Sequence, residues 1–222
     1  MPGAKKQIIK MITGMAGRYS PYNIYSDWIE TSALAIANTC TLRHDDLWKR
    51  REKDYVSTML KYEEPERNRL REMFYLLVDA LEEEISDVLG EIYMECGMGS
   101  KYTGQFFTPF HLSYLTAQCA LWPKVQSFDG ETITLNEPSC GGGGMIIAAF
   151  KVLKDAGINP QKYLKVVAQD LDWKGVYMTY LQLSLLGVKA IVVQGDTLRE
   201  PYVHKYPRER ILKTPAELGL LI

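Results

Sequence analysis

The chain has 222 residues, of which 46% are hydrophobic and 24% are charged, so it is long enough and apolar enough to bury a sizeable core. Its 26 Lys and Arg residues nearly balance its 27 Asp and Glu residues, and the net charge of -1 gives no overall attraction to a polyanion. No apolar run reaches the roughly 18 to 20 residues of a membrane span, and the first residues lack the apolar core of a signal peptide. We therefore expect a cytoplasmic protein that makes no membrane contact.

The first hundred residues are predicted to form a helical domain. Apolar residues recur at helical spacing from Trp28 to Ala37 and again from Leu70 to Leu89. The pair Asp45-Asp46 is of the type preferred at helix N-caps, and it precedes a charged helical segment. Pro65 suits the first turn of the next helix. We therefore predict a helical N-terminal domain over residues 1–100.

The pattern changes where the glycines of GMGSKYTGQFFTP, including Gly104, interrupt the helical periodicity. Beyond residue 100 the predicted helices are HLSYLTAQCALW, MIIAAFKVLKDAG and WKGVYMTYLQLSLLG, and the predicted strands are ETITLNEP, YLKVVAQD and AIVVQGD. Helices and β-branched strands alternate along this part of the chain, which is typical of an α/β domain with a parallel, doubly wound sheet. The second domain is therefore predicted over residues 101–222.

The cysteines and histidines do not form a metal-binding pattern. The four cysteines are widely separated and include no C-x-x-C pair, and the three histidines lie in unrelated contexts. We therefore expect neither a metal site nor a disulfide framework.

Each predicted strand ends in residues that suit one part of a nucleoside ligand, and open parallel sheets bind ligands at the carboxyl ends of their strands. Gly141–Gly144 follow the first strand, where glycine permits close backbone approach and the next helix N-terminus favours a carboxylate. Asp170 ends the second strand, at a spacing that suits ribose hydroxyls, and Asp196 follows the third, where its carboxylate is able to accept from an adenine amine. The alternative is a flexible glycine loop with two Asp residues that merely cap turns.

Four segments resemble successive motifs of the N6-adenine DNA methyltransferase family, most closely the modification subunits of type I restriction systems. They are GQFFTP (104–109), EPSCGGGG (137–144), AQDLDWKGVYMTYLQLSLLG (168–187) and GDTL (195–198), and they occur in the family's order. The resemblance implies a Rossmann-like, S-adenosylmethionine-dependent methyltransferase sheet, first half only, preceded by an all-α domain. It also implies S-adenosylmethionine as the cofactor.

The resemblance assigns cofactor-binding roles residue by residue. The FTP segment is expected to touch the methionine part of the cofactor, the glycine turn to cradle it, Asp170 to bind the ribose and Asp196 to read the adenine amine. Glu137 stands where the family has Asp or Asn, and Gly142 where it has Ser or Thr. The full set of implied cofactor-binding residues is Phe107, Thr108, Pro109, Glu137, Pro138, Cys140, Gly141, Gly143, Asp170, Leu171, Asp196 and Leu198.

The family's catalytic motif, (N/D/S)PP(Y/F), has no clear counterpart, because neither NPPY nor NPPF occurs in the sequence. The best alignment sets Ile211 and Leu212 on a short strand and the motif on Thr214-Pro215-Ala216-Glu217. That tetrapeptide keeps one proline, but a hydroxyl replaces the amide and a charge replaces the stacking ring. Thr214 and Pro215 therefore mark a degenerate motif position, and the catalytic residues stay unassigned.

Three hypotheses remain open at this point. The chain is a DNA adenine-N6 methyltransferase, alone or after a partner completes it, or a non-catalytic accessory subunit that binds the cofactor, or an interaction module with a vestigial pocket. A sheet with only its first strands leaves an open edge that proteins normally pair or cover. We therefore expect a homo- or hetero-oligomer, with DNA approached together with a partner subunit.

Overall fold

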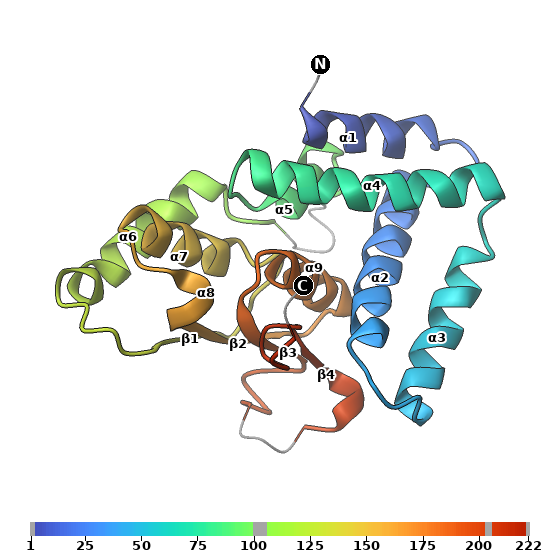
Figure 1. The fold of residues 1–222 in the computed structure, drawn as a ribbon. Coiled ribbons are helices and arrows are strands. Elements are labelled where there is room, and N and C mark those ends of the chain that lie inside the picture. Colours follow the sequence, from blue (N-terminus) through green and yellow to red (C-terminus); the bar gives the residue numbers. More distant parts are fainter. Residues whose placement is uncertain (1–2, 100–105, 203–205, 221–222) are drawn as a thin grey trace. The chain divides into compact units, whose positions relative to one another are not determined.

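The computed structural model describes residues 3–99, 106–202 and 206–220 of the chain (Figure 1). It divides into two compact units, Met1–Phe106 and Phe107–Ile222. The sequence analysis set the boundary at residue 100, and the loop expected around Gly104 lies outside the described residues.

The first unit is helical, as the sequence predicts. Asp45 caps its third helix by accepting a hydrogen bond from the backbone N–H of Trp48 at 3.0 Å, and Pro65 lies in the first turn of the fourth. Both predicted helix starts are therefore confirmed. The helices are α1 (Ala4–Gly14), α2 (Pro21–Thr39), α3 (Asp46–Met59), α4 (Glu64–Glu83) and α5 (Val88–Glu95).

Aromatic side chains form the centre of this unit. Tyr25, Trp28 and Tyr93 are completely buried, and the Tyr25 ring meets Trp28 edge-on at 6.0 Å between centroids. The Tyr25 hydroxyl donates to the backbone carbonyl of Leu89 at 2.8 Å, which ties α2 to α5. The apolar periodicity of the sequence therefore corresponds to core packing in this unit.

The second unit alternates helices and strands in the predicted order. Its sheet is built from β1 (Ile133–Glu137), β2 (Leu164–Asp170), β3 (Lys189–Gln194) and β4 (Ile211–Lys213). Its helices are α6 (Phe110–Gln126), α7 (Gly144–Asp155), the four-residue α8 (Pro160–Tyr163) and α9 (Trp173–Leu185), and the 3-10 turn η1 (Arg208–Arg210) precedes β4. The predicted α/β domain is confirmed.

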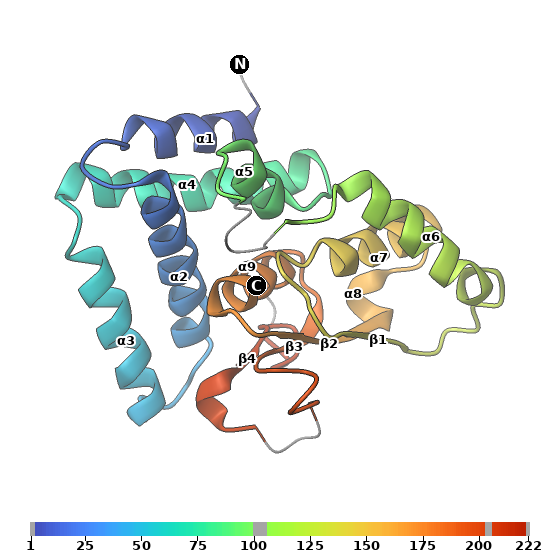
Figure 2. The same cartoon turned by 180° about the vertical axis from the view of Figure 1, so that it is seen from behind.

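The sheet order is β1-β2-β3-β4, with the first three strands parallel. Right-handed crossovers that always add the next strand in one direction leave their helices on one face. Figures 1 and 2 agree with this, since α7 and α9 lie on the same side of the sheet and the segment that leads to β4 lies on the other. Within the described residues the strands add in one direction only, as in the first half of the predicted doubly wound sheet.

The helix-covered face of the sheet holds the core of this unit. Val166 lies level with Ala190, and Ala168 with Val192, and all four side chains are fully buried. The fourth strand differs from expectation because β4 runs antiparallel to β3, with Val192 opposite Leu212. Among the described helices, none combines the length and the apolar character needed to cross a bilayer.

Candidate functional site

The carboxyl ends of the three parallel strands lie side by side along one side of the sheet, which we call its carboxyl edge; the opposite side, where the same strands begin, is the amino edge. Glu137 at the end of β1 lies level with Ala168, and Asp170 at the end of β2 lies level with Gln194 at the end of β3. The loops that follow these strands therefore start side by side. This is the edge at which open parallel sheets bind ligands.

Asp170 joins the glycine turn to the end of β2. One of its carboxylate oxygens, Oδ2, accepts from the backbone N–H of Gly141 at 2.8 Å, and the other, Oδ1, accepts from the N–H of Asp172 at 2.9 Å. The N–H of Cys140 donates to the Gln169 carbonyl at 2.9 Å and extends the same contact. A carboxylate offers about four acceptor positions, so two remain for a ligand's hydroxyls.

The turn itself is held from behind by α9. Thr179 donates its hydroxyl to the Gly141 carbonyl at 2.9 Å, and Gln182 donates its amide to the Gly142 carbonyl at 2.7 Å. Gly143 has a φ of 90°, and a Cβ there would lie 3.1 Å from the Thr179 hydroxyl oxygen. Both the backbone conformation and the close approach therefore require glycine.

The sequence analysis did not identify Thr179 and Gln182 as site residues. Both side chains are fully buried in α9, whose other buried positions are mostly apolar, with Lys174 and Ser184 as the exceptions. A pair of polar residues three positions apart in such a helix was the available signal, since buried polar groups require partners.

Phe107 lies against the glycine turn. A Cβ on Gly141 would come within 2.9 Å of the Phe107 ring, so glycine at this position makes room for the phenyl group. Phe107 is half-buried, while Thr108 and Pro109 are exposed, and α6 begins directly after them. The structure thus brings the FTP segment to the predicted turn through its aromatic residue.

The third strand end is linked to the other two. The N–H of Gly195 donates to the Asp170 carbonyl at 2.8 Å, and the Thr197 hydroxyl donates to the Pro138 carbonyl at 2.7 Å. The segments that carry Glu137, Pro138, Asp170 and Asp196 therefore form one connected surface, as the sequence analysis expected.

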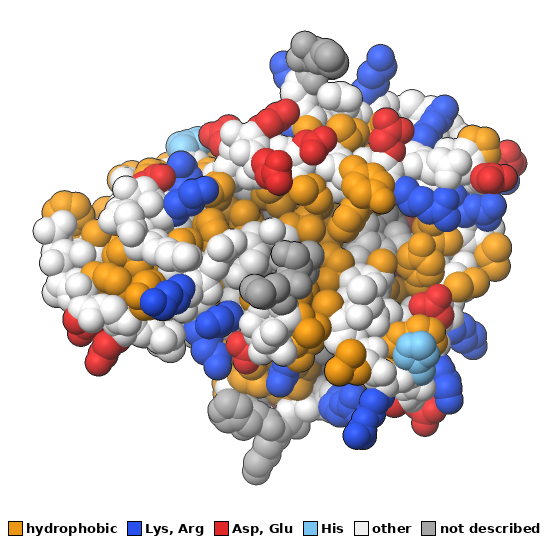
Figure 3. Space-filling model, viewed as in Figure 1, with side chains coloured by type: hydrophobic (Ala, Val, Ile, Leu, Met, Phe, Trp, Pro, Cys, Tyr) orange, Lys and Arg blue, Asp and Glu red, His pale blue; other side chains and the backbone are white. Residues whose placement is uncertain are grey.

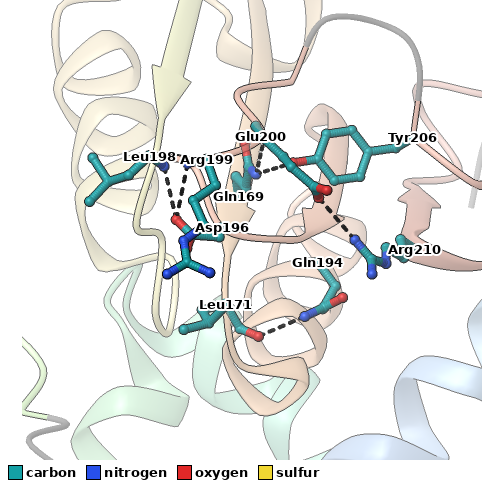
Figure 4. Close-up of polar contacts among 9 residues, drawn as sticks. All are labelled: Gln169, Leu171, Gln194, Asp196, Leu198, Arg199, Glu200, Tyr206 and Arg210. Atoms are coloured by element: carbon teal, nitrogen blue, oxygen red, sulfur yellow. Dashed lines mark hydrogen bonds and ion pairs between the residues drawn. The ribbon is translucent and has the colours of Figure 1, made fainter.

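Asp196 caps its own turn in this structure (Figure 4). Its Oδ1 accepts from the backbone N–H of Leu198 at 3.0 Å and of Arg199 at 3.4 Å, and its Oδ2 lies 3.5 Å from the Arg199 guanidinium. Leu198 is 95% exposed, and Leu171, whose carbonyl accepts from Gln194 at 2.8 Å, is 67% exposed. Two large apolar side chains are therefore exposed next to the residues that carry the carboxylates.

A second polar cluster, which the sequence did not reveal, holds the loop after Asp196. The buried Gln169 amide donates to the Glu200 carbonyl at 3.0 Å and to the Tyr206 hydroxyl at 2.7 Å, and Glu200 pairs with Arg210 at 3.1 Å (Figure 4). The Tyr206 ring packs on Gly195, where a Cβ would lie 2.6 Å from it. Gly195 is therefore needed for this close contact.

Burial perturbs two acidic groups at this edge. Burial raises the pKa of Glu137 above its ordinary value, although the Ser139 N–H, at 3.3 Å, stabilises its ionised form. Burial also raises the pKa of the Cys140 thiol well above its ordinary range. Both shifts favour the neutral forms of these groups.

Thr214 and Pro215 lie at the opposite edge of the sheet. The Thr214 hydroxyl donates to the Val188 carbonyl at 2.6 Å and accepts from the Ala190 N–H at 2.9 Å, both at the amino end of β3. A strand rises roughly 3.3 Å per residue, so Thr214, beside the start of β3, lies on the order of 20 Å from Asp196, which follows the end of β3. The alignment of this tetrapeptide with the catalytic motif therefore fails, because the antiparallel β4 delivers it to the wrong end.

The chain matches a known family over more than half its length. The family model for N-6 DNA methylases matches residues 84–215. Over 125 residues the chain is 27% identical to the type I restriction enzyme MjaIX methylase subunit of Methanocaldococcus jannaschii. That match covers 54% of this chain but only 21% of the relative, so the chain spans about a fifth of the relative's length.

Two solved structures are similar at 14% sequence identity. One is the type I restriction-modification system methyltransferase subunit of Streptococcus thermophilus, with a TM-score of 0.47 over 92% of this chain and 60% of that one. The other, from Listeria monocytogenes, is assigned to the class I S-adenosylmethionine-dependent methyltransferases and has a TM-score of 0.44 over 78% of this chain and 54% of that one.

Proposed function

Because the chain belongs to the N-6 DNA methylase family, we propose that its second unit binds S-adenosylmethionine at the carboxyl edge of the sheet. The observation that carries this proposal is the linkage of the three strand ends through Gly141 to Asp170, Asp170 to Gly195, and Thr197 to Pro138. A ligand that spans all three loops meets one continuous surface.

The residues at this edge fit the parts of that cofactor. The glycine turn and the N-terminus of α7 offer backbone N–H groups and a positive dipole end to the methionine carboxylate. Phe107 covers the turn, and Asp170 retains acceptor positions for the ribose hydroxyls. Asp196 and the exposed Leu171 and Leu198 suit the amine and the faces of the adenine ring.

The remaining implied residues act around the turn. Glu137, Pro138 and Cys140 shape the entry into it, Gly143 supplies one of its two positive-φ residues, and Thr108 and Pro109 extend the segment that begins with Phe107. S-adenosylmethionine supplies the methyl group when it is bound. The chain's own contribution is to bind and orient the cofactor.

For methyl transfer, we propose that a partner supplies the groups that hold the target adenine of DNA. The transfer requires the adenine amine in line with the cofactor's methyl and polar groups that stabilise the developing charge. Thr214 and Pro215 lie at the far edge of the sheet, so they do not serve this role. A non-catalytic, cofactor-binding accessory subunit is the second candidate, and the same observation favours it for the isolated chain.

Calorimetric titration with S-adenosylmethionine tests the cofactor proposal. The chain should bind the ligand, and Asp170→Ala should weaken binding by roughly 1 to 3 kcal/mol, because the turn and the ribose lose a shared acceptor. Asp155→Ala, at the other end of α7, removes the same charge and should leave the affinity unchanged. Equal affinities for the two variants would contradict the assignment of Asp170.

Incubation with adenine-containing duplex DNA and labelled cofactor separates the two functions. Incorporation of label above a matched Asp196→Ala sample means that the isolated chain is a methyltransferase. No incorporation, together with retained cofactor binding, supports a subunit that needs a partner or that acts as an accessory.

A further inference from the structure

A pocket lies between α2 and α3 in the first unit. Its volume is about 350 Å³, at the lower end of the range for small-molecule sites. Trp48, Glu52 and Tyr55 line it at intervals of four and three residues, so they share one face of α3, and Asn38 of α2 lines it as well. The pocket and the proposed cofactor site share no residue.

The amide of Asn38 has a fixed orientation in this pocket. Its Nδ2 donates to the Glu52 carboxylate at 3.0 Å and to the backbone carbonyl of Trp48 at 3.4 Å. Both of these oxygens only accept, so the amide nitrogen must face them and the amide oxygen Oδ1 is left over. Asn38 is 8% exposed, and within the described residues its Oδ1 is buried without a hydrogen-bond partner. An N–H group of a ligand that reaches this oxygen would offset the cost of burying it.

The hydroxyl groups beside Asn38 also have acceptor positions left. Thr39 donates its hydroxyl to the Ala35 carbonyl at 2.9 Å, and Thr41 donates its own to the Ala37 carbonyl at 2.7 Å, so both oxygens keep lone pairs. The Glu52 carboxylate forms no ion pair with any residue that the structure describes. The pocket therefore combines one negative charge with a set of hydrogen-bond acceptors.

Aromatic rings add flat surface to the same pocket. The rings of His44 and Trp48 stack with their centroids 3.9 Å apart and their planes at 9°, and the Tyr55 ring lines the pocket further along α3. The His44 imidazole and the Tyr55 hydroxyl accept as well as donate, so neither requires an acceptor from a ligand. Aromatic faces attract cations, and Trp does so most strongly.

The charges around the pocket do not exclude a cation. Figure 3 shows Lys and Arg side chains mixed with Asp and Glu side chains over the α3 region, at the lower right of the view. Lys49, three positions before Glu52, lies 3.5 Å from the carboxylate of Asp46. Exposed charges of mixed sign are largely screened by salt.

We propose that this pocket binds a guanidinium group. Guanidinium carries five N–H donors in one plane and no acceptor, forms paired hydrogen bonds with a carboxylate, and stacks on aromatic rings. Glu52 supplies the carboxylate, and Trp48 and Tyr55 supply the rings. Neutral nucleobases carry acceptors that need donors, and a lysine ammonium lacks the plane. A free arginine-like molecule and an arginine side chain of a partner protein share this chemistry.

Titration of the full chain with N-acetyl-arginine amide tests the pocket. The indole N–H signal of Trp48 in ¹H–¹⁵N spectra, identified by its loss in Trp48→Phe, should shift and saturate with a dissociation constant of about 1 mM. Glu52→Gln keeps an acceptor for Asn38 but removes the charge, so it should weaken binding about tenfold or more. Glu72→Gln, at an exposed position of α4, removes the same charge and should bind as the unchanged chain does. Circular dichroism melting shows whether each variant folds.

Two further probes test the chemistry on the unchanged chain. N-acetyl-citrulline amide keeps the shape but replaces the charge and a donor with a carbonyl, and N-acetyl-lysine amide keeps the charge without the plane. Both should bind about tenfold more weakly or worse. The proposal is overturned by a Trp48 signal that does not saturate by about 20 mM arginine derivative, or by equal binding of either probe or of Glu52→Gln.

Free L-arginine distinguishes the two sources of the group. Tighter binding of free arginine than of the blocked derivative means that its amino and carboxyl groups are recognised too, which identifies a small molecule. Equal or tighter binding of the blocked derivative identifies an arginine side chain of a protein. Either result supports recognition of the guanidinium group.

Discussion

The two edges of the sheet in the second unit use polar side chains in different ways. At the carboxyl edge, Asp170 and Asp196 accept hydrogen bonds from nearby backbone N–H groups, yet both side chains are partly exposed and keep acceptor capacity. At the amino edge, Thr214 is fully buried, and its hydroxyl donates to one backbone group and accepts from another. The first arrangement leaves acceptor positions unused, and the second satisfies a buried hydroxyl within the fold.

The comparison shows why a local motif cannot be assigned a role without its strand direction. Asp196 and Thr214 both follow strands of the same sheet, but β3 is parallel to its neighbour β2 and β4 is antiparallel to β3. Residues after the two strands therefore emerge at opposite edges. A change at one edge should alter ligand binding, and a change at the other should alter stability alone.

The largest effect is expected from Thr214→Val, which keeps the shape of the side chain and removes its hydroxyl. The Ala190 N–H and the Val188 carbonyl would lose their partner in a buried place, at a cost of about 3 kcal/mol in the free energy of unfolding. Urea denaturation measures the loss, and the affinity for S-adenosylmethionine should not change below the transition. Thr116→Val, on the exposed side of α6, is the control and should change stability by less than about 0.5 kcal/mol. A large loss of cofactor affinity in Thr214→Val would remove the distinction between the edges.

A smaller effect on stability, joined to an effect on binding, is expected from Gly143→Ala. The left-handed backbone and the 3.1 Å approach to the Thr179 hydroxyl together cost about 2 kcal/mol. Gly157, at the other end of α7, has a φ of 76° but open space around it, so Gly157→Ala carries only the backbone strain. Paired thermal melts and titrations should show that Gly143→Ala loses more stability and also cofactor affinity. Identical behaviour of the two variants would mean that the turn is not a binding element.

Much of the carboxyl edge could be predicted because its signals are local. A strand that is followed by four glycines and a helix, and acidic residues at the ends of the next two strands, can be recognised within short windows. The helical first unit and the three parallel strands follow from periodicity in the same way. Their convergence follows from a general rule of parallel sheets.

The rest depends on contacts between distant segments. The three residues of β4 carry no pattern that distinguishes a parallel from an antiparallel strand, so its direction was not predictable. The contact of Tyr206 with Gly195, and the hydrogen bonds from Thr179 and Gln182 to the turn, join segments that only the tertiary fold brings together. Such contacts hold the site in shape without any signature of their own.

The smallest effect is a pH dependence at Glu137, which lies at the carboxyl edge beside Asp170. Burial raises the pKa of this carboxyl in the folded chain, and the Asp170 charge acts in the same direction. Between the unfolded value of about 4.3 and the higher folded value, the folded chain binds more protons, so the Glu137 contribution to stability falls as pH rises. Glu137→Gln removes this dependence. The stability of the unchanged chain minus that of the variant should therefore decrease from acidic to neutral pH and level off above the folded pKa. Chemical denaturation of both proteins across this range measures the difference, and a difference that increases with pH would show that the ionised carboxylate stabilises the edge.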